Sequence, residues 1–269
     1  MRQLLGFEYR KLVRCKSIYI CLIVMLVLET AGIVITKATM EFVGGITDTV
    51  MNGTDGLSSL FSYNGLIYLL KACNSSNMLI YFSIFVTIFV CMDFGEGTIK
   101  NIVSRGFSRE QVFFSKSIVI CTGSIIFALA SMIVNFVVGS IAFSVGDGFD
   151  GKAILALLVQ LLAMIAYTMF DVLLSVLFTK LGGALTLGLI VPLVFPVLIK
   201  ALDMAIVLMS KNSDVRSDFL SRFTISANIG KIAELGAEGS DILLAAVIFV
   251  VYILFFTLLG LLVIRKKEV

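Results

Sequence analysis

The chain has 269 residues, of which 59% are hydrophobic and only 14% are charged, and its mean hydropathy is +1.07. A soluble domain of this length would need more charge on its surface, and several apolar runs reach the roughly 20 residues that cross a bilayer as a helix. The composition therefore excludes a soluble protein and predicts an all-α polytopic membrane protein.

Residue usage also argues against a metal site or a disulfide framework. Histidine is absent, and the five cysteines contain no C-x-x-C pair. The net charge of +3 is small, so the distribution of charge along the chain is more informative than its sum.

Residues 1–16 form a basic and amphipathic segment. On a helical projection, Leu5 and Tyr9 fall on one side, and Arg10 and Lys11 fall on another. This pattern is typical of an "elbow" helix that lies in the cytoplasmic interface of the membrane. A secretory signal peptide is the alternative, but the apolar run that follows has no small-residue cleavage site.

Six apolar runs follow, and they predict a single transmembrane domain over residues 1–269. The expected spans are about 17–35, 78–92, 116–143, 153–178, 184–208 and 241–264. Polar links join them, and the longest links are 36–77 and 209–240. We predict that 209–240 is an extracellular segment.

An even number of spans places both termini on one side of the membrane, and the positive charges indicate which side. Of the 21 Lys and Arg residues, 13 lie in the two termini, in the segment that ends at Lys116, or at Lys180. Positive charge is enriched in cytoplasmic loops. We therefore predict that both termini are cytoplasmic.

The charged segment 93–115 separates the second and third spans. Two glycines end the second span, and residues 98–105 can form two helical turns before Gly106, which suits a helix C-terminus. Ser108 with Gln111 three residues later forms a capping-box pattern at the start of the next helix. A short helix at the cytoplasmic face can either seal the interface or dock into a soluble partner.

This segment carries the strongest resemblance to a known family. The run Glu96-Gly97-Thr98-Ile99-Lys100, followed by Arg105, Arg109 and Lys116, resembles the cytoplasmic signature of type-2 ABC exporter permeases. The N-terminal F-E-Y-R-K-L resembles the interfacial helix of that family, and the six-span layout follows the same order. The alternative is an ordinary inner loop whose charges stop transfer.

The resemblance implies a partnership. It implies two such permeases, identical or homologous, each coupled to a cytoplasmic ABC ATPase. It also implies a coupling helix between spans two and three, formed by Glu96, Gly97, Thr98, Ile99, Lys100, Ile102, Arg105 and Arg109. Relatives of this size export antimicrobial peptides, antibiotics or other amphipathic compounds, often for self-protection, from the bacterial cell membrane.

Several polar residues lie inside the predicted spans. A charged side chain there costs roughly 2.5–3.5 kcal/mol on insertion scales, so Glu29 and Asp171 either line a translocation path or fix helix packing. Asn135 and Gln160 are expected to form hydrogen bonds between helices. In the fifth span, two prolines remove backbone hydrogen bonds and predict a kink, at Pro192 and Pro196.

The remaining functional expectations follow from what the sequence lacks. Residues 146–152 fit the spacing of a P-loop, but Ala153 replaces the Ser or Thr that holds Mg²⁺, and no strand precedes it. We therefore expect no cofactor on this chain, with ATP and Mg²⁺ bound by the partner, no catalysis and no nucleic acid. The alternative function is a stand-alone carrier, or an immunity or sensor protein, without an ATPase.

Overall fold

The structure is a computed structural model, and it describes residues 2–50, 63–74, 76–95, 97–146, 149–178, 180–209, 220–234 and 236–266. These residues form helices and short connections, with no strand among them. The helices are α1 (Arg2–Arg14), α2 (Lys16–Val50), α4 (Gly65–Lys71), η1 (Ala72–Asn74), α5 (Ser76–Gly95), α6 (Thr98–Ser104), α7 (Arg109–Ala142), α8 (Gly151–Leu177), α9 (Leu181–Met209), η2 (Ser221–Phe223), α10 (Ile225–Ile232) and α11 (Gly239–Lys266).

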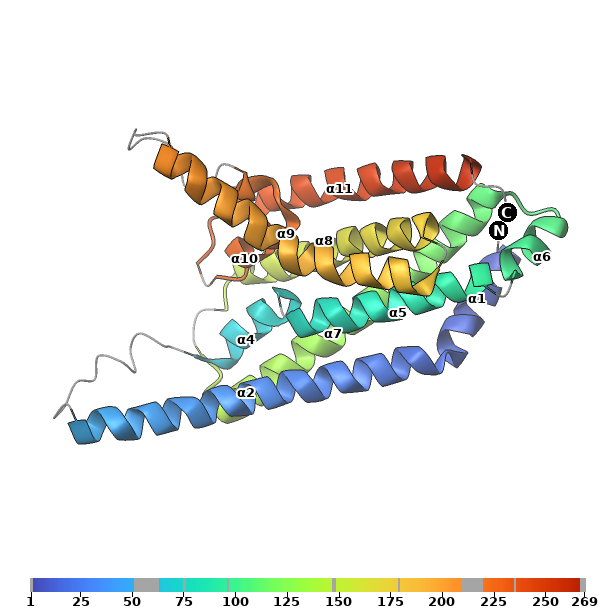
Figure 1. Cartoon of the computed structure of the whole chain (residues 1–269). Coiled ribbons are helices and arrows are strands. Elements are labelled where there is room, and N and C mark those ends of the chain that lie inside the picture. The colour runs from blue at the N-terminus through green and yellow to red at the C-terminus, as the bar shows by residue number, and fades with distance from the viewer. Residues whose placement is uncertain are drawn as a thin grey trace.

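Six segments within the described residues are long and apolar enough to cross a membrane: α2, α4 with α5, α7, α8, α9 and α11. The predicted number of spans is therefore confirmed, and the chain is a multi-pass membrane protein. Both chain ends lie at one end of the bundle, beside α6 (Figure 1). We call this the terminal end, and we call the opposite end, with α4 and α10, the far end.

The spans form a central group and a flanking group. Helices α5, α7 and α8 pack against one another in the centre, and about half of each span is buried within the chain. Helix α2 packs on α5 and α7, α11 packs on α8 and α7, and α9 packs on α5 and α8. The chain covers α9 least, because few residues of that span are buried.

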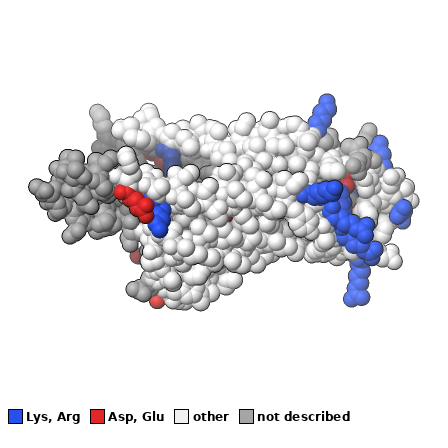
Figure 2. Space-filling model, turned by 90° about the horizontal axis from the view of Figure 1, so that it is seen from below, with Lys and Arg blue, Asp and Glu red and all other residues white. Residues whose placement is uncertain are grey.

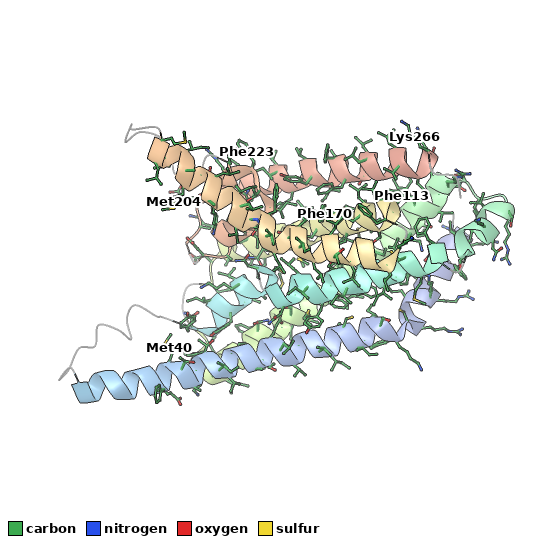
Figure 3. The ribbon with its side chains drawn as sticks, viewed as in Figure 1. Met40, Phe113, Phe170, Met204, Phe223 and Lys266 are labelled. Atoms are coloured by element: carbon green, nitrogen blue, oxygen red, sulfur yellow. The ribbon has the colours of Figure 1, made fainter. Side chains whose placement is uncertain are left out.

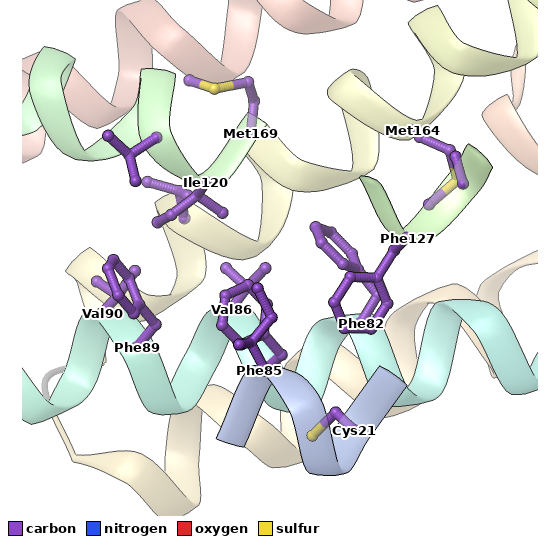
Figure 4. Close-up of a cluster of buried hydrophobic side chains, with 14 of the residues drawn as sticks. Cys21, Phe82, Phe85, Val86, Phe89, Val90, Ile120, Phe127, Met164 and Met169 are labelled. Carbon is purple, nitrogen blue, oxygen red and sulfur yellow. The ribbon is translucent and has the colours of Figure 1, made fainter. Parts of the chain in front are cut away.

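Aromatic rings fill the space between the central helices (Figure 4). Phe82, Phe85 and Phe89 of α5 are at most 1% exposed. Phe127 of α7 lies 5.6 Å from Phe82 and 5.7 Å from Phe85, centroid to centroid. Since lipid tails are as apolar as these rings, close packing rather than exclusion from water holds the helices together inside a bilayer.

The first span continues beyond its predicted end. Helix α2 extends to Val50 instead of stopping near Ile35. No glycine or proline interrupts it soon after Ile35, and the Thr36 and Thr39 hydroxyls donate to backbone carbonyls one turn back. Loss of hydrophobicity ends a span but does not end a helix, so the helix can continue past the predicted end of the span.

Two segments predicted as polar links instead pack into the bundle. Within 36–77, α4 buries Leu66 and Leu70 and lies against α7. Within 209–240, α10 buries Ile229 and Ile232 against α8 and α11. In both segments an amphipathic turn follows a capping residue, so a short helix can cover the far end of the spans.

Helix α9 contains both prolines and remains one helix from Leu181 to Met209. It changes direction part-way along its length (Figure 1). A proline ring clashes with the carbonyl four residues earlier and removes one backbone donor, which bends a helix without necessarily ending it.

Candidate coupling site

Helix α6 is a short, separate helix at the terminal end. Gly97 precedes it with φ +65°, and Gly106 follows it with φ +89°, so both ends use backbone conformations that favour glycine. Ser108 then caps α7: its hydroxyl accepts from the Gln111 amide, and the Gln111 side chain accepts from the Ser108 amide. The helix, break and cap agree with the local structure predicted from sequence. Glu96 lies outside the described residues.

One side chain anchors α6 to the bundle. Ile102 is buried with Leu4 of α1 and Val112 of α7, and Phe107 packs against this group. The short helix therefore contacts both the N-terminal helix and the third span through this apolar group.

The other side of α6 is polar and exposed. Lys100, Asn101, Ser104 and Arg105 are exposed, and Thr98 and Arg109 are partly buried. Figure 2 shows Lys and Arg gathered at the terminal end of the face that it displays. Of the predicted coupling residues, Ile102 faces the bundle, whereas Lys100 and Arg105 are available to a partner.

Directly behind α6, four charged residues from three helices form a buried cluster, which we call the junction cluster: Glu8 and Lys11 of α1, Asp93 of α5 and Lys116 of α7. The ammonium groups of Lys11 and Lys116 both donate to the Asp93 carboxylate. Lys116 Nζ also lies 3.6 Å from Glu8 Oε1, close enough for an ion pair but too far for a hydrogen bond.

The junction cluster is shielded from solvent and formally neutral. Glu8, Asp93 and Lys116 are at most 4% exposed. The Phe89 ring lies beneath both lysines, with its centroid 4.7 Å from Lys11 Nζ and 5.4 Å from Lys116 Nζ, so cation–π attraction adds to the ion pairs. Removing one partner from such a buried group leaves an uncompensated charge and costs about 3–5 kcal/mol.

Sequence reasoning did not assemble the junction cluster. Glu8 and Lys11 were part of the predicted interfacial helix, and Asp93 and Lys116 bounded the charged segment, but no spacing rule relates these positions. The expected apolar face of α1 was also displaced: Leu4, Glu8 and Leu12 are the buried side, whereas Tyr9 is exposed. The available signal was that Glu8 and Asp93 each lie beside an apolar run, on the same predicted side of the membrane.

The polar residues inside the spans form separate groups. Glu29 of α2 is buried and accepts hydrogen bonds from the Ser131 hydroxyl, at 2.8 and 3.0 Å, and from the Asn135 amide at 2.8 Å. The structure thus brings together two residues selected from sequence, Glu29 and Asn135, and adds Ser131. The group joins α2 to α7.

The other two predicted positions join different helices. Asp171 of α8 accepts from the Ser83 hydroxyl of α5 at 3.1 Å, and Gly188 of α9 leaves the room that these two side chains occupy. Gln160 of α8 donates to the Leu70 carbonyl at 2.7 Å, which ties α4 to the fourth span. These contacts join α8 to α5 and to α4.

Among the described residues, no group of three or more Cys, Asp or Glu side chains is placed to hold a metal ion.

The comparison with known families fits this architecture. The family model described as "ABC-2 family transporter protein" matches residues 4–202, from α1 through most of α9. No individual curated protein matches the chain.

The match covers well over half of the chain, and it includes the junction cluster, α6 and five of the six spans. The chain is therefore a membrane permease of the ABC class. It belongs to the ABC-2 transporter family, whose members generally work with an ATPase subunit in a membrane.

Proposed function

We propose that this protein is the membrane-spanning half of an ATP-driven exporter, and that α6 receives the motion of a separate ATPase. One observation carries the proposal. The buried Ile102 packs α6 against α1 and α7, while Lys100 and Arg105 remain exposed at the terminal end. A helix held in this way has one face for the permease and one for a partner.

The junction cluster supports a specific route for the motion. It joins α1, α5 and α7, the helices on either side of α6, by buried charge pairs. Such pairs have defined geometry and resist sliding of one helix past another. A push on α6 therefore displaces the three helices together, and α5 and α7 carry the displacement into the centre of the bundle.

In this proposal the terminal end faces the cytoplasm of a bacterial cell, which agrees with its excess of Lys and Arg. A second permease, identical or homologous, completes the transporter. The partner ATPase binds ATP and Mg²⁺, and this chain performs no catalysis. The cargo is an amphipathic compound or peptide, such as an antimicrobial peptide or antibiotic.

The alternative is a stand-alone carrier, or an immunity or sensor protein. An ion-coupled carrier needs titratable groups grouped at the middle of the membrane. Glu29 and Asp171 instead contact different helices through different partners. This arrangement favours the exporter.

Coupling can be tested in the reconstituted complex. The permease is co-expressed with an ABC ATPase that co-purifies with it and placed in vesicles, and both ATP hydrolysis and cargo export are measured. Arg105→Glu should lower export by about tenfold or more, because it reverses the charge on the exposed face of α6, while the spans stay folded.

The matched control is Lys152→Glu, which reverses an exposed charge at the far end of α8. We expect export by this variant to be unchanged. Unchanged export by Arg105→Glu, or ATP-independent transport by the permease alone, would contradict the proposed coupling.

A further inference from the structure

A cavity outside the coupling site lies between α8, α9, α10 and α11 and continues between α9, α10 and α4. It has an apolar compartment of about 260 Å³ and a polar compartment of about 660 Å³, and Pro196, Thr224 and Ser226 line both of them. The two compartments are therefore adjacent. Figure 3 places Phe170, on the apolar side, in the middle of the bundle, and places Met204, on the polar side, toward the far end.

The apolar compartment has a stacked aromatic wall. Phe256 of α11 lies 5.4 Å from Phe170 of α8 and 5.5 Å from Tyr252, centroid to centroid. Pro192 and Pro196 line the same compartment on α9, so the bend of that helix and the opening involve the same residues. The rings are held by one another and form a ready surface for a hydrocarbon chain.

The apolar compartment also reaches the lipid-facing surface. Phe195 of α9 lines it and is 53% exposed. Because the chain covers little of α9, an amphiphile can enter sideways from the bilayer without crossing the bundle.

The polar compartment collects lysines from three helices: Lys71 of α4, Lys200 of α9 and Lys231 of α10. Asp203 also lines it, but both of its oxygens accept backbone hydrogen bonds, from Leu220 at 2.8 Å and Ser221 at 2.9 Å. That carboxylate holds the backbone, and the three ammonium groups supply the positive charge of the compartment, which suits an anion. Glu234 is the second acid in the lining.

We propose that this cavity binds an amphiphile with an anionic head and a long apolar chain. The chain lies on the wall of Phe170, Tyr252 and Phe256, and the head lies among Lys71, Lys200 and Lys231. Lys200 is one helical turn, about 6 Å, beyond Pro196 toward the far end. The head of the ligand therefore lies nearer the far end than its chain, as it does for a lipid in one leaflet of a membrane. Binding is independent of ATP and of a partner.

The absence of tryptophan from the chain allows a direct measurement. A single tryptophan is introduced by Phe256→Trp, and the purified protein in phosphatidylcholine nanodiscs is titrated with a dodecyl phosphate brominated at its chain end, which quenches nearby tryptophan. We expect saturable quenching. The matched control is Phe255→Trp, the neighbouring residue, which is 53% exposed and does not line the cavity. There we expect only weak quenching that rises in proportion to the probe.

The charge of the head group is tested next. We expect Lys200→Gln with Lys231→Gln to weaken binding of the phosphate probe by about tenfold, since each loses a charge-assisted contact. A brominated probe with a trimethylammonium head should not saturate. If Phe256→Trp does not give a monodisperse protein, Phe170→Trp is the second reporter from the same wall.

Equal, unsaturable quenching at Phe256→Trp and Phe255→Trp would overturn the proposal, and so would equal affinity for the phosphate and trimethylammonium probes. Phosphatidylglycerol in the nanodisc identifies the source. Competition with the probe indicates a lipid of the bilayer, whereas saturable binding without competition indicates a free amphiphile. Because no ATPase is present, failure of the proposed coupling leaves this result unchanged.

Discussion

Buried carboxylates at the terminal end of the bundle and deeper in the spans are held in different ways. At the terminal end, Asp93 receives two lysines, and one of them also lies beside Glu8. Deeper in the spans, Glu29 is held by a hydroxyl and an amide, and Asp171 by a hydroxyl. A lysine next to the interface can join a buried acid at little cost, because its long stem reaches from the membrane edge, whereas inside the span neutral donors are cheaper to bury.

Close helix packing occurs at both ends of the bundle. At the terminal end α7 and α11 approach so closely that a glycine is needed, where Gly260 meets Phe113, and at the far end Gly65 of α4 meets Ser140 of α7 in the same way. The far half differs because α9 bends there and borders two open compartments. We infer that this is the part that accommodates a ligand.

Neutralising the acid of the junction cluster should have the largest effect. We expect Asp93→Asn to destabilise the protein by about 3–5 kcal/mol, because it leaves Lys11 and Lys116 buried with insufficient negative charge. Thermal unfolding of the purified protein in detergent measures the loss. The control is Asp150→Asn, an exposed acid at the far end, which should change stability by less than about 0.5 kcal/mol.

A double variant isolates the pair. Asp93→Asn combined with Lys116→Met should be more stable than the sum of the single effects predicts, by about 0.5–3 kcal/mol, since the two residues contact each other. Additive effects would show that the junction cluster does not act as a unit.

A tight contact at the terminal end should give the next largest effect. A Cβ at residue 260 would lie 2.5 Å from Cζ of Phe113, so Gly260→Ala should cost about 1–3 kcal/mol by overpacking. The same unfolding assay measures it. Gly182→Ala in α9, where nothing lies within 4 Å of the added carbon, should be neutral or slightly stabilising. Equal losses in the two variants would contradict the difference in packing.

Neutralising an acid inside the spans should have the smallest effect. We expect Glu29→Gln to cost less than about 1 kcal/mol, because the amide oxygen can still accept from Ser131 and Asn135. Its unfolding temperature is compared with that of Asp93→Asn under identical conditions. If both variants lose the same stability, the carboxylates at the terminal end and deeper in the spans are not held differently.

Local signals in the sequence were reliable where the physics is local. Gly106 and the Ser108 cap predicted where a helix ends and the next begins, because a left-handed residue and a capping box involve neighbouring residues only. The end of α2 and the packing of α4 and α10 onto the spans were not predicted, for the opposite reason. A polar stretch does not reveal whether it stays helical or folds back onto other spans.

The sequence by itself determined that this chain is a six-span membrane protein with a short, capped helical insert after the second span. Apolar length and turn chemistry are properties of contiguous residues. Only the tertiary structure decided that Glu8, Lys11, Asp93 and Lys116 form one cluster. It also decided that an apolar compartment between α8, α9, α10 and α11 adjoins a basic compartment between α4, α9 and α10. These groupings depend on which helices become neighbours. Helices distant in the chain pack together when the shapes of their surfaces fit, and the hydrophobic periodicity of a sequence does not predict that fit.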